Sequence, residues 1–277
     1  MKRKLSNIGL ILVFILGFII LIYPKVSNYY NSLVGSYSIG KYEKEIEKID
    51  EVKVDEILEK GRKYNKELLK KGFSIKTGKS TDENYLNQLK VNEEEVIGFI
   101  IIDKINVRLP IYHGTSEPVL QRGVGHLEGT SLPIGGEGMH SVLTGHTGLP
   151  SAKLFTDLEK LEKNDLIIIK ILGETFTYKV NEKEVVLPEE VENITPVKGK
   201  DILTLVTCTP YGVNSHRLLV KSEKTNNIEE EKNIEVIGKK EDIFKYIFII
   251  IILIIGGYFI LKKYKKNKKV ERRNEDL

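Results

Sequence analysis

The sequence predicts a mainly β protein, a closed or nearly closed barrel with helices on its flanks. Short runs rich in Ile, Val, Leu, Thr and Tyr follow one another through residues 96–222, separated by Gly, Pro, Asn and Asp. Such runs are typical of β-strands. A stretch dense in Lys and Glu precedes them, and an apolar segment lies near each end of the chain. We therefore expect one β domain with a helical appendage, flanked by two transmembrane helices.

The first segment, residues 1–25, has the pattern of a membrane anchor. Three basic residues at positions 2–4 precede an uncharged apolar run from Ile8 to Tyr23. A secretory signal peptide is the alternative, but such a peptide ends in a small-residue cleavage site. Here the run is followed by Pro24. We therefore favour an uncleaved signal anchor.

Residues 243–261 form a second apolar segment, interrupted only by Lys245. About 20 helical residues cross the hydrocarbon core of a bilayer, so this segment is long enough to span it. A polar linker, residues 223–242, precedes it, and a basic tail, residues 262–277, follows it. Because positive charge concentrates on the cytoplasmic side of membrane proteins, we expect a two-pass protein of the cell membrane. Both termini would be cytoplasmic and the intervening domain extracellular.

The net charge does not indicate a nucleic-acid partner. The whole chain carries a formal charge of +4, but the positive excess lies in the two basic termini. A nucleic-acid footprint requires a basic patch on the domain itself. The body between the termini is mildly acidic, so we expect no nucleic acid, and we interpret the basic tail as a topology signal.

Residues 26–95 are expected to form a helical linker. From Lys41 to Lys71 the sequence is rich in Lys and Glu, with apolar residues at three- and four-residue steps. This spacing predicts one or two amphipathic helices, broken near Gly61. A polar loop, residues 72–80, follows them. The helices are either a solvated spacer that lifts the domain off the membrane or a regulatory element.

The barrel region, residues 96–222, contains seven or eight predicted strands. Two short helical stretches interrupt them, around Val119–Gly123 and Ala152–Leu161. Charged Lys and Glu occur in the later strands, as expected for a sheet with one solvated face. In chain order the strand-like runs are VIGFIIID, INVRLPIY, HSVLTGH, DLIIIKI, ETFTYKV, ILTLVTC and HRLLVKS.

The only cysteine, Cys208, lies at the end of the run ILTLVTC. A lone thiol forms no intramolecular disulfide and cannot supply the several thiolates of a structural zinc site. It is therefore either a small buried apolar residue or a nucleophile, and a strand end beside a turn presents a reactive group well. Arg217 lies in the next run, HRLLV. Because side chains alternate along a strand, His216 is excluded from the face of Cys208 if Arg217 shares it.

A thiol nucleophile at neutral pH needs a proton partner, because free cysteine titrates near 8.5. His146 is one candidate, since it follows an apolar run and lies between two glycines that allow a sharp turn. His113 and His126 also lie at strand ends or in loops, while His140 begins a strand. Spacing alone leaves His146, His126 and His113 open. Neither HExxH nor a Cys/His cluster at ligand spacing occurs, so we expect no metal and no cofactor.

Three separated blocks resemble one known family, the class C sortases, which polymerise pilins in Gram-positive bacteria. These blocks are GHLEGTSLPIGGEGMHS, LTGHTGLPSAKLF and TLVTCTPYGVNSHR, and they occur in the family's order. The two flanking membrane segments also fit this class better than the singly anchored classes. The resemblance covers residues 96–222 and implies an eight-stranded sortase-type β-barrel. It also implies the catalytic set His146, Cys208 and Arg217.

The resemblance also implies a reaction. The thiolate of Cys208 attacks the Thr–Gly carbonyl of an LPXTG-like sorting signal on a pilin or surface protein and forms a thioacyl enzyme. His146 acts as general acid and base, and Arg217 orients the substrate and stabilises the oxyanion. The expected acceptor is a lysine amine of another pilin subunit.

One departure from the family concerns the lid. Many class C sortases carry an Asp-Pro-aromatic motif before the barrel, whose aromatic residue covers the cysteine. This chain has no proline between Pro24 and Pro110, so the motif is absent. Residues 72–89 take the corresponding place and contain Phe73 and Tyr85. Either these aromatic residues cover the cleft or the segment is a plain connector.

Three other functions compete with pilin polymerisation. A housekeeping sortase would join proteins to a cell-wall peptide amine. A hydrolytic cysteine peptidase would share the nucleophile and the base, although papain-like sequence around the cysteine is absent. A membrane scaffold without catalysis would keep Cys208 as a core residue.

Overall fold

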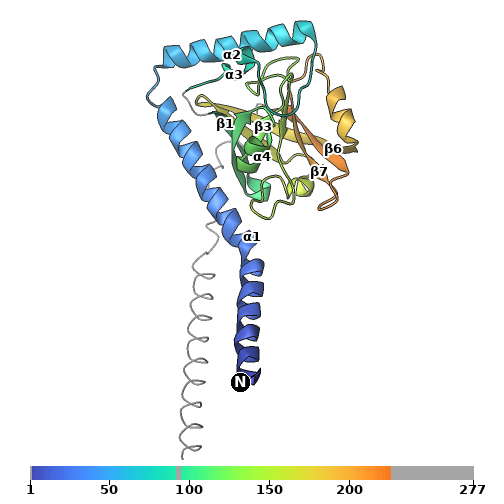
Figure 1. Cartoon of the computed structure of the whole chain (residues 1–277). Coiled ribbons are helices and arrows are strands. Elements are labelled where there is room, and N and C mark those ends of the chain that lie inside the picture. Colours follow the sequence, from blue (N-terminus) through green and yellow to red (C-terminus); the bar gives the residue numbers. More distant parts are fainter. Residues whose placement is uncertain (1, 92–94, 226–277) are drawn as a thin grey trace, which may run out of the picture. The chain divides into compact units, whose positions relative to one another are not determined.

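Eight strands close into a barrel in the order β1-β2-β3-β4-β7-β8-β6-β5, which confirms the predicted eight-stranded barrel (Figure 1). The computed structural model describes residues 2–91 and 95–225. The strands are β1 (Val96–Ile102), β2 (Val107–His113), β3 (Val124–His126), β4 (His140–Thr144), β5 (Leu166–Ile171), β6 (Glu174–Val186), β7 (Ile202–Thr209) and β8 (His216–Lys224).

The barrel interior is filled by apolar side chains from strands on all sides. On β7 the inward residues are Leu203 and Leu205, and on β8 they are Leu218 and Val220. The residues between them point outward, because side chains alternate along a strand. β1 is buried along its whole length, since its outer face is covered as well.

Two pairings place the ends of particular strands at one edge of the barrel. β4 runs parallel to β7, with Thr144 opposite Val206. β7 and β8 are antiparallel neighbours. The carboxyl ends of β4 and β7 and the start of β8 therefore meet at the same edge.

Four α-helices and three 3-10 turns accompany the barrel in the described residues. Figure 1 shows α1 passing beside the barrel and α2 lying across one end of it. Tyr42 fixes α1 to the strands, because its Oη donates to the carbonyl of Ile97 at 2.9 Å and accepts from the amide of Leu172 at 3.0 Å. The helices are α1 (Lys2–Ile46), α2 (Glu51–Lys71), α3 (Glu83–Leu86) and α4 (Glu117–Arg122), and the turns are η1 (Asp103–Ile105), η2 (Leu158–Lys160) and η3 (Pro188–Asn193).

The break predicted near Gly61 is wrong, because α2 continues through this glycine. The chain breaks instead before Asp50, whose carboxylate caps α2 by accepting from the amide of Val52 at 3.2 Å. A Cβ atom on Gly61 would lie 2.9 Å from Cδ1 of Ile134. Gly61 therefore allows the helix to approach the barrel closely and does not end it.

Other boundaries also differ from the prediction. The short strand β3 was missed because three residues are too few to show alternation, and β6 continues to Val186. The helix expected over 152–161 is only the single turn η2. Phe155, Leu158 and Leu161 repeat every three residues and are all buried, so an irregular segment that covers the core imitated a helical pattern.

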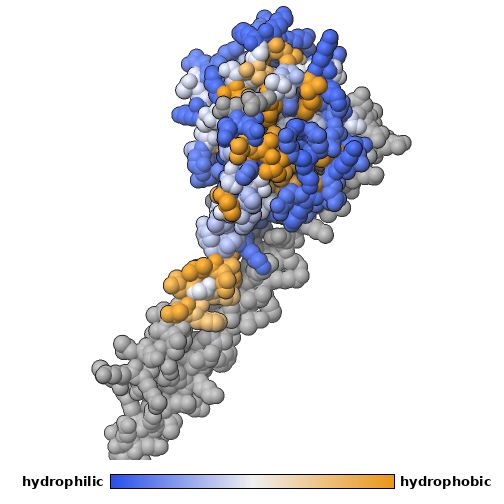
Figure 2. All heavy atoms as spheres, turned by 90° about the vertical axis from the view of Figure 1, so that its right-hand side faces the viewer, coloured by the Kyte–Doolittle hydropathy of each residue, from blue (hydrophilic) through white to orange (hydrophobic). Residues whose placement is uncertain are grey.

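One helix of the described part is long and apolar enough to cross a membrane. It is α1, whose candidate span begins at Val13 and is not buried by the rest of the protein. Figure 2 shows its exposed apolar side chains as an orange surface below a largely blue domain. α1 runs without a break through Pro24 and past the expected boundary at residue 25.

Only the first residues of the predicted C-terminal segments belong to the described part of the chain. β8 extends to Lys224, two residues beyond the expected end of the barrel. The rest of the linker 223–242, the apolar segment 243–261 and the tail 262–277 lie outside the described residues.

Candidate active site

Cys208 lies near the end of β7, directly opposite Arg217 on β8. The thiol is half-buried and reduced. Its neighbour Thr207 and the neighbour of Arg217, Leu218, are buried and point inward, so Cys208 and Arg217 share the outer face of the barrel. His216 pairs with Thr209 instead, as strand alternation predicts.

The Arg217 side chain is held by the turn that connects β7 and β8. Its Nη1 donates to the carbonyl of His216 at 3.0 Å and to that of Asn214 at 3.2 Å. Asn214 adopts a left-handed backbone conformation, with φ of 59°, which asparagine tolerates better than most residues. The turn thus anchors the guanidinium beside the thiol and leaves its remaining donors free for a substrate.

His146 is brought to the same edge by the chain that leaves β4. The amide of Gly145 donates to the carbonyl of Val206 at 3.1 Å, and Thr207 Oγ1 donates to the carbonyl of Gly145 at 2.7 Å. These bonds hold Gly145, the residue before His146, against the C-terminal end of strand β7. The His146 side chain is 23% exposed, but its Nε2 atom is buried.

Glu117 faces the imidazole of His146 from the first turn of α4. Its Oε2 lies 3.4 Å from Nε2 of His146. Sequence reasoning missed this residue, because Glu117 lies in α4 and His146 in the loop after β4, and no spacing rule relates the two positions. The carboxylate borders one side of the imidazole.

The structure separates His146 from the other candidate bases. His126 is fully buried, with Tyr85 Oη 2.8 Å from Nδ1 and the Ser131 carbonyl 2.8 Å from Nε2. Burial lowers the pKa of His126 to about 4 and that of His113 to about 3. Both rings are therefore neutral core residues near pH 7 and do not reach the outer face beside Cys208.

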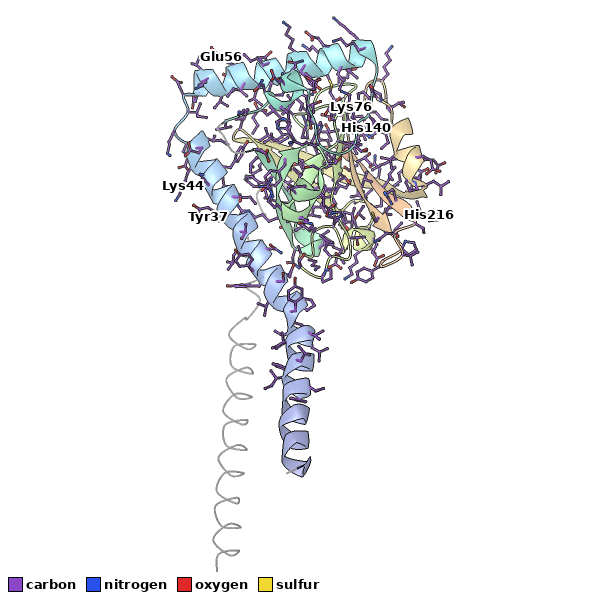
Figure 3. The ribbon with its side chains drawn as sticks, in the orientation of Figure 1. Tyr37, Lys44, Glu56, Lys76, His140 and His216 are labelled. Carbon is purple, nitrogen blue, oxygen red and sulfur yellow. The ribbon has the colours of Figure 1, made fainter. Side chains whose placement is uncertain are left out.

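The remaining two histidines lie beside opposite ends of strand β7. His140 pairs with the first residue of β7, whereas His216 pairs with the last (Figure 3). Both ring nitrogens of His140 are hydrogen-bonded: Nδ1 lies 2.8 Å from the carbonyl oxygen of Thr195, and Nε2 lies 2.8 Å from Oγ1 of Thr204. Of the five histidines, only His146 and His216 lie at the edge that holds Cys208.

A buried apolar cluster lies next to the thiol on the outer side of the barrel. Val206 and Leu219 form the next opposed pair on the face that Cys208 and Arg217 share. This group, the outer cluster, comprises the buried residues Leu127, Val142, Ile194, Val206 and Leu219, with Ile75, Val186 and Val191 packed against it.

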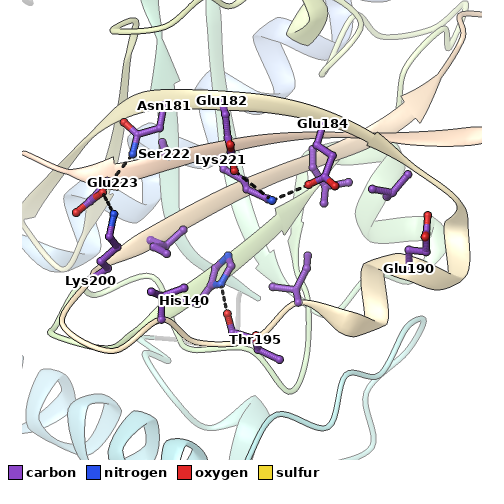
Figure 4. A pocket seen from close by; sticks show the side chains of 15 residues that line it. His140, Asn181, Glu182, Glu184, Glu190, Thr195, Lys200, Lys221, Ser222 and Glu223 are labelled. Carbon is purple, nitrogen blue, oxygen red and sulfur yellow. Dashed lines mark hydrogen bonds and ion pairs between the residues drawn. The ribbon is translucent and has the colours of Figure 1, made fainter.

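A cavity of about 600 Å³ continues from the outer cluster beneath the segment between β6 and β7. Figure 4 shows its polar rim, in which Lys221 contacts Glu184 at 2.6 Å and Glu182 at 3.3 Å. Ile194 and Leu219 contribute to both the cavity and the outer cluster. The buried outer cluster therefore lies between the thiol and the cavity.

The segment 72–89 follows the same face only in part. Tyr85 does not cover the cleft, because it is fully buried in the core. Ile75 instead packs against the outer cluster. Lys76 fixes this contact, since its amide donates to the carbonyl of Glu128 at 2.9 Å and its Nζ lies 2.8 Å from Glu128 Oε1.

A barrel whose lone thiol faces an arginine, with a histidine loop at the same edge, fits an enzyme that uses a cysteine nucleophile. Comparisons with known proteins narrow this class to the sortases, which are cysteine transpeptidases. The Sortase domain family matches residues 100–225. Sortase A of Streptococcus agalactiae is 31% identical over 175 residues, which are 61% of this chain and 70% of the relative. Sortase D of Bacillus subtilis is 32% identical over 136 residues, 49% of this chain and 66% of the relative.

Solved structures narrow the assignment. Sortase C1 from Streptococcus agalactiae has a TM-score of 0.65 and 46% identity, covering 69% of this chain and 99% of that one. Sortase C from Streptococcus pneumoniae has a TM-score of 0.64 and 37% identity, covering 68% and 96%. The chain belongs to the sortase family, and its similarity to these structures places it in class C.

Proposed function

We propose that this protein is a membrane-anchored sortase that polymerises pilins, with His146, Cys208 and Arg217 as its catalytic residues. The observation that carries the proposal is the opposition of Cys208 and Arg217 on the outer face, beside the fixed loop of His146. A pilus role is supported by the similar structures. One of them is sortase C1 of GBS pilus island 1, with 42% identity, and the structure of Streptococcus pneumoniae sortase C bears on pilin substrate specificity.

The reaction proceeds in two transfers. The Cys208 thiolate attacks the carbonyl carbon of Thr in an LPXTG-like signal, and Arg217 stabilises the oxyanion that forms. The Thr–Gly bond breaks when His146 protonates the departing glycine amine. A lysine amine of a second pilin then attacks the thioester. It loses its proton to His146, forms an isopeptide bond and releases the thiolate.

The outer cluster supports the proposed site from behind. It extends from Cys208 through Val206 and Leu219, each of which is only 3% exposed, so it is already removed from water by the protein itself. Its packing holds the two strands that carry Cys208 and Arg217.

Anchorage is proposed from the two apolar ends of the chain. Residues 1–25 form the cytoplasmic stub and signal anchor, residues 26–95 the helical linker and residues 96–222 the catalytic barrel. The linker 223–242, the second span 243–261 and the tail 262–277 follow. In this arrangement both termini are cytoplasmic and the barrel meets exported substrates.

The decisive experiment incubates the full chain in lipid nanodiscs with a pilin that carries an LPXTG-like signal and lysines. We expect a ladder of covalent multimers on a denaturing gel. The Cys208→Ala variant should give none, and pilin whose lysines have been dimethylated should give acyl-enzyme without a ladder. Hydrolysed monomer alone would contradict polymerisation. Product formed only with an added cell-wall peptide amine would assign the housekeeping role.

A further inference from the structure

The loop that follows His146 is bonded to helix α1 close to its apolar segment. Asn31 Nδ2 donates to the carbonyl of Ser151 at 2.7 Å, and the amide of Lys153 donates to Asn28 Oδ1 at 2.7 Å. Residues more than 100 positions apart are thereby fixed to each other. The position of this loop above a membrane is consequently set by where α1 leaves the bilayer.

The rise of the helix gives the distance of these contacts from the end of the apolar run. An α-helix rises about 1.5 Å per residue. Asn28 and Asn31 follow Tyr23, the last residue of the apolar run, by five and eight positions. The loop contacts therefore lie only about 8–12 Å beyond the end of the apolar run, at the outer boundary of the headgroup region, which adds about 5–8 Å on each side of the hydrocarbon core.

The same edge of the barrel carries exposed apolar side chains. Tyr211 and Val213, in the turn directly after Cys208, are 66% and 69% exposed, the highest values among the large apolar residues of the barrel. The Tyr211 ring lies against Gly148, where a Cβ atom would be 3.2 Å from it. The turn and the loop of His146 thus form one rim, completed by Leu149 and Pro150.

We propose that this rim, residues 148–150 and 210–213, rests on the outer leaflet of the membrane, so that Cys208 opens towards the lipid headgroups. The inference rests on the proposed anchorage of α1. Tyrosine suits this place because its ring is apolar and its hydroxyl remains in water, and it is enriched at membrane interfaces. A site at this height receives substrates that are themselves still held in the membrane.

The position of the rim, and not its apolarity alone, favours lipid as the partner. A soluble partner needs no particular distance between the rim and the apolar run. A bilayer does, and the bonds of Asn28 and Asn31 supply that distance. The rim should therefore contact lipid in the absence of any substrate.

The chain contains no tryptophan, so a single introduced tryptophan reports its own surroundings. Three full-length variants are compared in nanodiscs with and without brominated lipids: Tyr211→Trp at the rim, Tyr23→Trp at the end of the apolar run, and Tyr37→Trp on α1. Tyr37 is 74% exposed and points away from the barrel (Figure 3), and it lies about 20 Å beyond Tyr23 by helical rise. Circular dichroism checks that each variant is folded.

We expect brominated lipid to quench Tyr23→Trp strongly, Tyr211→Trp by at least half as much, and Tyr37→Trp by less than a tenth. Quenching of Tyr23→Trp without quenching of Tyr211→Trp overturns the membrane-facing rim while leaving the anchorage intact. If Tyr23→Trp is also unquenched, the anchorage itself fails. A Tyr211→Trp emission that shifts only when a pilin is added would assign the rim to substrate and would also overturn the inference.

Discussion

Arg217 is positioned by the backbone of its own turn and not by a carboxylate. Both hydrogen bonds from its Nη1 go to carbonyl oxygens, of His216 and Asn214. A neutral anchor of this kind leaves the positive charge uncompensated. The guanidinium is therefore available for an oxyanion that develops at the carbon attacked by Cys208.

We predict that Arg217→Lys lowers kcat/KM for a sorting peptide by about 10²-fold or more, the usual cost of losing one oxyanion donor. Lysine keeps the charge but lacks the planar fork that can bond the turn and the substrate together. The rate at which Cys208 reacts with a small thiol reagent is measured alongside and should change by less than threefold. A lysine variant with full transpeptidase activity would remove Arg217 from the proposed catalytic set.

Sequence reasoning at the residue scale succeeded where a short-range rule applied. Alternation along two adjacent strands placed Arg217 with Cys208 and His216 away from it, because the connecting turn is short. It could not choose among His146, His126 and His113, since burial depends on the whole fold. The sequence could not predict the contact between Glu117 and His146, because the two residues lie in separate segments that only the fold brings together.

At the scale of elements, the segment before the barrel is part of the core and not only a connector. The Tyr85 hydroxyl, just before the end of α3, lies 2.8 Å from Nδ1 of His126 and also accepts from the amide of Gly114 at 3.0 Å. Removing residues 72–89 would therefore expose buried polar groups and unfold the domain. Effects of the segment on access to Cys208 have to be tested by substitution at Ile75.

We predict that the domain loses stability in acid because His126 is buried neutral. The unfolded ring takes up a proton near pH 6.5, but its folded pKa is about 4. Stability from this group is complete above pH 6.5 and disappears as the pH falls towards 4, on the order of 3 kcal/mol. The measurement is the thermal midpoint of the full chain in detergent between pH 4.5 and 7.5.

His126→Gln is the matched variant for this pH effect. The glutamine amide can still donate towards the Ser131 carbonyl, but it does not titrate. The variant should be less stable at pH 7.5 and should lose less stability between pH 7.5 and 4.5 than the parent. Equal losses would show that His126 does not govern the acid response.

The elements could be predicted where a periodic pattern was long, and the prediction failed where tertiary packing overrode local propensity. The barrel followed from alternating β-branched runs, whereas the three residues of β3 carried too little pattern. Gly61 suggested a helix end, but it is needed for the approach to Ile134. Such a requirement comes from a residue 73 positions away, and local propensity cannot reveal it.

For the whole molecule, α1 is more than an anchor, because it reaches the loop of His146. Asn28 and Asn31 bond the backbone at Lys153 and Ser151, and the Phe155 amide in turn donates to the carbonyl of His146 at 3.0 Å. A series of hydrogen bonds thus connects the membrane segment of α1 to the loop that carries His146, the proposed base. The sequence assigned these residues only to the helical linker 26–95, since asparagine on a helix carries no pattern that predicts a distant contact.

We predict that Asn28→Ala combined with Asn31→Ala loosens this loop and slows catalysis. Each lost hydrogen bond removes about 1 kcal/mol, which the loop cannot recover because its partners are fixed backbone groups. kcat/KM for a soluble sorting peptide should fall about three- to tenfold, and amide exchange over 147–155 should accelerate. Ser32→Ala is the control, because its hydroxyl bonds only Tyr29 within the same helix, so both readouts should match the parent. Unchanged exchange in the double variant would mean that α1 holds the domain at the membrane without positioning the base.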